Sequence, residues 1–104
     1  MEVEAIFLEI WFPDDPLDDT RLYLEDIEDE LREVLTKNKL GKVTGSGSGE
    51  LGSNLDIDIF HESDFARAMA LICETMRKLK VPTNAIVTRY EPVKTIYKVY
   101  PDSP

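Results

Sequence analysis

The segment GKVTGSGSGELGSNLDIDIF, residues 41–60, contains all five glycines of the chain and then alternates apolar and acidic residues. From Leu55 onward the apolar side chains fall on one face of an extended strand, and Asp56 and Asp58 fall on the other. Glycine and serine before this strand favour a second strand and a loose turn between the two. The segment therefore predicts a β-hairpin with one buried face and one solvent-exposed face.

A phosphate-binding loop is the alternative for a glycine-rich segment. Such a loop places a lysine after its last glycine and starts a helix there, so that backbone N–H groups face the phosphate. The residues GSGSGELGS, 45–53, lack that lysine and lead into a strand. The hairpin is therefore preferred.

Two amphipathic helices flank this hairpin along the chain. Residues 20–40 carry apolar side chains at helical spacing, and Gly41 is expected to cap that helix at its C-terminus. Residues 65–80 repeat the spacing, with Ser63 or Asp64 as the expected N-cap. The hairpin thus lies between two helices in sequence order.

Further strands precede the first helix and follow the second. EAIFLEIWF, residues 4–12, and AIVTRY, residues 85–90, both read as strands, and VKTIYKVY, residues 93–100, fits an extra C-terminal strand. The order strand, helix, strand, strand, helix, strand predicts an α+β, ferredoxin-like βαββαβ fold. Its antiparallel sheet would carry both helices on one face, because each strong strand has only one apolar face.

The composition is that of one globular intracellular domain. A chain of 104 residues, 42% hydrophobic and 32% charged, fits a single domain over residues 1–104, with 100–104 as a short tail. Its one cysteine, Cys73, excludes an intrachain disulfide and a zinc site of several thiolates. The N-terminal apolar run lacks a basic leader and is too short to span a bilayer. We therefore expect a cytoplasmic protein.

Acidic residues are concentrated in the first third of the chain. The net charge is −9, and residues 1–33 carry thirteen acids and two bases. Such a field repels nucleic-acid phosphates and anionic lipids and attracts basic proteins. We therefore expect a basic protein partner, with neither nucleic acid nor membrane as a partner and no cofactor. The acids expected on the outer face of the first helix are Glu25, Asp26, Glu28, Asp29, Glu30 and Glu33.

Aromatic and acidic residues share the second face of the predicted sheet. Phe7, Glu9 and Trp11 alternate along the first strand, and Asp56 and Asp58 point the same way from the hairpin. Aromatic anchors ringed by acids resemble an interface that selects a basic partner. These residues and the helix acids are therefore the predicted partner-binding residues.

The C-terminal segment bears on the same face. Tyr97 is expected to join the aromatic residues there. A second copy of the chain that covered this face, or paired with the edge strand of residues 93–100, would give a homodimer.

A metal site is the alternative reading of the two aspartates. Asp56 and Asp58 would lie about 6.6–6.8 Å apart on one strand face, and Glu9 would add a third oxygen ligand for a divalent cation. Palm-type nucleotidyl-transfer domains share the topology, but the motifs that they place at the hairpin are missing here. Because alternating aspartates also keep a strand face wet, no metal ligand or catalytic residue is assigned.

The whole chain resembles small uncharacterised bacterial βαββαβ proteins with a glycine-rich hairpin followed by a D-I-D strand. The matching segments are GSGSGELGSNLDIDIF, residues 45–60, and ALICETMRKLKVP, residues 70–82. Some proteins of this kind are immunity partners that neutralise toxins, so the resemblance implies a binding role.

The predicted function is therefore a non-enzymatic protein-binding module, namely a toxin-neutralising immunity protein with a basic toxin as its partner. A dimeric regulatory domain that binds a small ligand is the first alternative. A metal-dependent enzyme that uses Asp56 and Asp58 is the second.

Overall fold

The fold is a five-stranded sheet with two helices. The computed structural model describes residues 5–13, 24–49 and 51–100. The elements are β1 (Ile6–Pro13), α2 (Leu24–Lys37), β2 (Gly41–Gly49), β3 (Gly52–Ile59), the 3-10 turn η1 (Glu62–Asp64), α3 (Phe65–Lys78), β4 (Ile86–Arg89) and β5 (Thr95–Lys98). All strand pairs are antiparallel, in the order β2-β3-β1-β4-β5. The predicted ferredoxin-like α+β fold, the hairpin and the extra C-terminal strand are confirmed.

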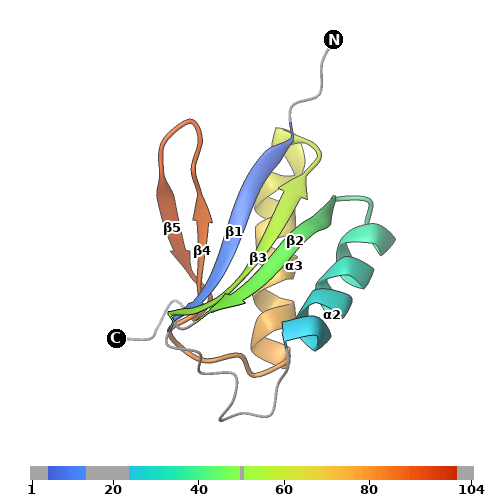
Figure 1. Cartoon of the computed structure of the whole chain (residues 1–104). Helices are drawn as coiled ribbons and strands as arrows, with labels where there is room; N and C mark the ends of the chain where they lie inside the picture. The colour runs from blue at the N-terminus through green and yellow to red at the C-terminus, as the bar shows by residue number, and fades with distance from the viewer. Residues whose placement is uncertain (1–4, 14–23, 50, 101–104) are drawn as a thin grey trace.

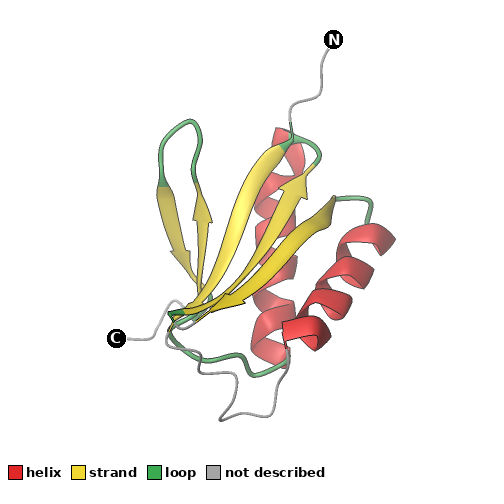
Figure 2. Cartoon of the chain, in the orientation of Figure 1, coloured by secondary structure: helices red, strands yellow, loops and turns green. Residues whose placement is uncertain are grey.

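The sheet and the helices form two layers. Figure 1 shows α2 and α3 on the same side of the sheet, and Figure 2 shows strands of the sheet passing in front of α3. No helix in the described part of the chain is long and apolar enough to cross a membrane. We call the side of the sheet away from the helices the open face. From the registers and the alternation along each strand, its residues are Phe7, Glu9, Trp11, Lys42, Gly45, Gly47, Asn54, Asp56, Asp58, Ile86, Thr88, Ile96 and Lys98.

The helix side of the sheet and the inner faces of both helices form the hydrophobic core. Burial along β1 alternates residue by residue, and the inward side chains of Leu8, Ile10 and Phe12 are fully buried. The other fully buried large side chains are Ile27, Leu31, Leu35, Leu40, Leu55, Ile57, Ile59, Ile72 and Met76. The period-two pattern of the strands and the helical spacing of α2 and α3 therefore meet in one core, as the sequence predicts.

Gly41 does not cap the first helix, which corrects the prediction. The helix ends at Lys37, and Lys39 with φ 55° makes the left-handed turn that follows. Gly41 begins β2, where an added Cβ would overlap the backbone carbonyl oxygen of Asp58. A glycine is needed there because the strands approach closely.

The predicted side-chain cap of the second helix is also not formed. Asp64 occupies the N-cap position of α3, but its side chain makes no capping hydrogen bond. The chain enters the helix through η1 instead, where the N–H of Asp64 donates to the carbonyl of His61 at 3.0 Å. Backbone hydrogen bonding thus closes this turn without a side-chain cap.

Gly52 adopts a backbone conformation and a close contact with β1 that a residue with a side chain would disturb. Its φ is +148°, and an added Cβ would overlap the carbonyl oxygen of Phe12 and lie 2.9 Å from the indole of Trp11. We expect Gly52→Ala to lower the free energy of unfolding by about 1–3 kcal/mol, measured by urea denaturation.

Gly49→Ala is the matched control in the same hairpin. An added Cβ at Gly49 has nothing within 4 Å, so this variant should change the free energy of unfolding by less than about 0.5 kcal/mol. Equal losses in the two variants would contradict the role assigned to Gly52.

Candidate functional site

Two carboxylates lie opposite each other at the centre of the open face. Glu9 of β1 is the register partner of Asp56 of β3, which places their Cβ atoms about 4.5–5.5 Å apart. Like charges that face each other across two strands destabilise the pair. A local arrangement that costs stability is typical of a functional site, and this one suits a cation.

Neighbouring side chains orient both carboxylates. The Tyr90 hydroxyl donates to Oε1 of Glu9 at 2.7 Å, and Nδ2 of Asn54 donates to Oδ1 of Asp56 at 3.2 Å. The hydrogen bond to Glu9 is the main cause of the raised pKa of Tyr90, followed by burial and by the charges of Glu9 and Asp56. A carboxylate can accept several hydrogen bonds. The carboxylates of Glu9 and Asp56 can therefore each still accept a hydrogen bond from a ligand.

Three hollows in the described structure each include an aromatic side chain of the open face, Phe7 or Trp11. The Phe7 hollow, about 380 Å³, is lined by Ala5, Ile6, Phe7, Glu62, Arg89, Tyr90, Glu91 and Pro92. The Glu9 hollow, about 330 Å³, is lined by Glu9, Trp11, Ile86, Thr88, Tyr90, Lys94 and Ile96. The Trp11 hollow, about 390 Å³, is lined by Trp11, Gly47, Ser48, Gly49, Leu51, Gly52 and Asn54. Tyr90 lines the first two and Trp11 the last two, so the hollows adjoin.

The Tyr90 ring sits among other side chains at one end of this surface. Its centroid lies 6.0 Å from that of Phe7, with the ring planes 26° apart. The Lys94 ammonium lies 5.9 Å from the Tyr90 centroid. Phe7 and Tyr90 are nevertheless 42% and 40% exposed, so both remain accessible to a ligand.

Arg89 fixes the chain beside Tyr90. Its guanidinium donates to both carboxylate oxygens of Glu62, at 3.1 and 2.5 Å, and it lies 4.5 Å from the centroid of the Phe65 ring. Its Nε also donates to the carbonyl of Glu91 at 2.6 Å. The hydrogen bonds between the two side chains, supported by their opposite charges, lower the pKa of Glu62 and raise that of Arg89. Arg89 therefore holds the turn after β4 in place, with its charge already balanced by Glu62.

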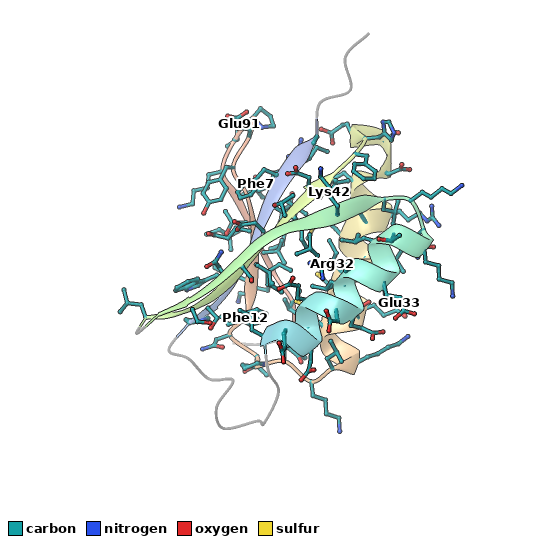
Figure 3. The ribbon with its side chains drawn as sticks, turned by 45° about the vertical axis from the view of Figure 1, so that its right-hand side comes forward. Phe7, Phe12, Arg32, Glu33, Lys42 and Glu91 are labelled. Atoms are coloured by element: carbon teal, nitrogen blue, oxygen red, sulfur yellow. The ribbon has the colours of Figure 1, made fainter. Side chains whose placement is uncertain are left out.

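The predicted site residues fall into two separate groups. Phe7, Glu9, Trp11, Asp56 and Asp58 lie together on the open face, and Figure 3 shows Phe7 on the sheet, away from Glu33 on α2. The acids predicted on the first helix lie on α2, in the other layer: Glu25, Asp26, Glu28, Asp29, Glu30 and Glu33. The two groups therefore do not form one continuous surface, and a role for either in binding a partner stays a prediction.

Part of the acidic helix surface is balanced internally. Arg32 pairs with Glu28 at 2.5 Å and with Asp29 at 3.6 Å. Exposed pairs at this helical spacing contribute a few tenths of a kcal/mol, about 0.3–0.5 each. The pairs of Arg32 with Glu28 and Asp29 thus add slightly to the stability of α2.

Tyr97 does not lie on the open face, which corrects the prediction. Its register partner is Val87, which faces the core, and its ring lies 6.0 Å from that of Phe65. Ile96 takes the open-face position and is 55% exposed. The prediction was wrong because the register of β5 against β4 decides the face, and alternation within the last segment does not reveal it.

The two aspartates do not assemble a metal site in the described residues. There, no group of three or more His, Cys, Asp or Glu side chains is arranged to hold a metal ion. Asp58 has Phe7 as its register partner on β1, so a third acid does not face it.

Several side chains of the site were missed at the sequence level. Tyr90 hydrogen-bonds Glu9 from 81 positions away along the chain. Asn54 precedes Asp56 by two residues on β3, so strand alternation alone would have placed it on the open face. Lys94 lies between the bend of residues 91–93 and β5, and no local pattern connects it to β1.

Among solved structures, this chain is similar to a phage SAM lyase in complex with S-methyl-5'-thioadenosine. The TM-score is 0.58 at 14% sequence identity, over 93% of this chain and 90% of that chain. A likeness at this identity shows the fold. No family model matches the chain, and no curated protein matches it. These comparisons do not confirm the resemblance to small uncharacterised bacterial proteins.

The match contradicts the predicted function. The matching protein is an enzyme, whereas the sequence favoured a non-enzymatic binding module and, within that class, a toxin-neutralising immunity protein. The prediction that the chain is not an enzyme is contradicted as well. The predicted function followed the acidic residues, the aromatic residues of the sheet face and the resemblance to immunity proteins, and none of these reveals what the open face binds.

The hydrogen bond between Tyr90 and Glu9 predicts a pH effect. It favours the neutral phenol, so its stabilising effect is present below the ordinary tyrosine pKa of about 10 and is lost as the pH rises through the raised pKa. In an absorbance titration of phenolate, Tyr90→Phe should remove a component that lies above pH 10.

Glu9→Gln is the matched control for that titration. It keeps Tyr90 and removes the negative charge, so the same component should move toward pH 10. A Tyr90 component already at pH 10 in the unsubstituted chain would contradict the hydrogen bond.

Proposed function

We propose that this chain is an enzyme that binds S-adenosylmethionine on the open face and cleaves it to S-methyl-5'-thioadenosine and a four-carbon amino-acid fragment. The observation that carries the proposal is the Glu9–Asp56 carboxylate pair on a face lined by aromatic rings. S-adenosylmethionine suits this face because it joins a sulfonium cation to an aromatic base. The likeness in fold to a SAM lyase supports this substrate.

The sulfonium belongs at the carboxylate pair. A cation there relieves the repulsion between Glu9 and Asp56, so binding recovers the stability that the pair costs the free protein. This attraction is lost when the ligand is a neutral thioether.

The amino-acid end of the substrate requires a cation for its carboxylate. Lys94 lines the Glu9 hollow beside Tyr90. Among the described residues that line the three hollows, the other cation is Arg89, and it is bound to Glu62. Lys94 is therefore assigned to the substrate carboxylate.

The reaction requires no proton from the protein. The bond between sulfur and the four-carbon chain breaks, and its electron pair stays on sulfur, which leaves as a neutral thioether. An oxygen of the substrate's own carboxylate forms the new bond to that carbon and closes a lactone, so neither water nor a base is consumed. The open face contributes by holding the two reacting ends of one molecule together.

The positive charge on sulfur is lost as the reaction proceeds. An interaction with that charge therefore favours substrate binding and does not favour the chemical step. The carboxylates attract the sulfonium in the bound substrate, and this attraction weakens as sulfur becomes neutral. Glu9 and Asp56 therefore lower KM without raising kcat. They also favour release of the neutral product.

We predict that Glu9→Gln and Asp56→Asn each raise KM for S-adenosylmethionine about tenfold, equivalent to ~1.4 kcal/mol. The kcat should change less than about threefold, since the lost interaction belongs to the bound substrate. Formation of S-methyl-5'-thioadenosine is measured by liquid chromatography, and mass spectrometry identifies the second product as the lactone. Glu33→Gln on α2 is the matched control and should leave both constants unchanged.

Two outcomes would count against the proposal. A folded wild-type chain that leaves S-adenosylmethionine intact contradicts the activity. A fall in kcat at constant KM in the carboxylate variants contradicts their assignment to binding.

A further inference from the structure

We infer that the Trp11 hollow is the purine subsite of this enzyme and that Asn54 selects a 6-aminopurine over a 6-oxopurine. The inference rests on the proposed function, in which the cationic part of the ligand lies at Glu9 and Asp56. Aromatic rings stand on both sides of that pair, Trp11 on one and Phe7 with Tyr90 on the other. The structure assigns the base to the Trp11 side for three reasons.

The first reason is that the face of the Trp11 indole is available for stacking. Tyr90 already contacts Phe7 and lies beside the Lys94 ammonium. Within the described residues, the indole of Trp11 makes no ring contact, although it lines two adjoining hollows. Stacking of a base on an aromatic side chain stabilises a complex by about 1–3 kcal/mol.

The second reason is the shape of the Trp11 hollow. Gly47, Gly49 and Gly52 line it and add no side chains to it, so a flat ring can approach the backbone beside the indole. The position at Gly49 has open space around an added Cβ. The hollow therefore has an aromatic wall and a glycine wall, which suits a planar ring.

The third reason is the amide of Asn54. One of its N–H groups donates to Oδ1 of Asp56, and an ionised carboxylate only accepts, so this bond fixes which way the amide points. One N–H donor and the oxygen Oδ1 remain for a ligand. An added Cβ at Gly47 would lie 3.1 Å from that oxygen, so the glycine leaves it uncovered.

The remaining donor and acceptor match adenine. Its 6-amino group donates to Oδ1 while its N7 accepts from the N–H, the usual pairing of asparagine with adenine. A 6-oxopurine presents two acceptors to the same amide, so the carbonyl oxygens would face each other. Turning the amide over would set Oδ1 against N7 instead, and the hydrogen bond to Asp56 would be lost.

Spacing along the strands agrees with this orientation. Trp11 lies two residues from Glu9 on β1, and Asn54 lies two residues from Asp56 on β3. Each step is about 6.6–6.8 Å on one strand face. A base on the Trp11 and Asn54 row therefore places the sugar between the rows and the sulfur at the carboxylates.

Trp11 reports on the subsite because it is the single tryptophan of the chain. The test titrates two neutral ligands, S-methyl-5'-thioadenosine and its 6-oxo counterpart S-methyl-5'-thioinosine, and follows tryptophan fluorescence. In the wild type, the adenosine compound should quench the emission and bind about ten- to hundredfold more tightly than the inosine compound, the range that one bidentate base contact gives. Asn54→Leu should reduce this ratio to within about threefold.

Two further variants keep the test independent of folding defects in Asn54→Leu. Gly49→Val adds a side chain to the wall of the hollow and should weaken the adenosine compound about tenfold or more. Phe7→Leu alters the opposite end and should change neither the affinity nor the ratio. Circular dichroism of each variant confirms the fold.

The outcomes separate this inference from the proposed activity. Cleavage of S-adenosylmethionine without quenching of Trp11 overturns the purine subsite and leaves the activity standing. Selective, Asn54-dependent quenching without cleavage supports the subsite and overturns the activity. A loss of binding in Phe7→Leu with none in Gly49→Val places the base at the other end and overturns the inference.

Discussion

The structure depends on β1, because it is the central strand of the sheet, with β3 on one side and β4 on the other. Its side chains alternate with a period of two, so its register fixes the core and the open face together. Leu8, Ile10 and Phe12 point to the helices and are fully buried. A slip of one residue would exchange these side chains for Phe7, Glu9 and Trp11, and would place a carboxylate in the core.

The same register creates the electrostatic feature of the open face. It sets Glu9 against Asp56, and the hydrogen bonds from Tyr90 and Asn54 hold the two acids where their charges oppose. A protein selected for stability alone would place a neutral or basic side chain at one of these positions. Retaining both acids makes sense where a cation binds, and the adjoining aromatic hollows add a place for a flat ring.

Local periodicity determines the elements, their order and which residues of β1 and β3 face each side of the sheet. The sequence therefore predicted the fold and the positions of the open-face residues Phe7, Glu9, Trp11, Asp56 and Asp58. Contacts between distant segments were not. Tyr90 meets Glu9, and Arg89 meets Glu62, through pairings whose register no single segment encodes. Tyr97 was assigned to the wrong face for the same reason. The function was mistaken because surface acidity is a property that many soluble proteins share, whereas the opposed carboxylates appear only when two strands are paired.

Calorimetry with two adenosyl ligands that differ in one charge tests whether the carboxylate pair is a cation site. One ligand carries a protonated amine in place of the sulfonium and is not cleaved; the other, S-adenosylhomocysteine, carries a neutral thioether. The cationic ligand should bind about tenfold more tightly at low salt, and this preference should shrink in Asp56→Asn and at high salt, where charges are screened. Equal affinity for the two ligands in the wild type would contradict a cation site at Glu9 and Asp56.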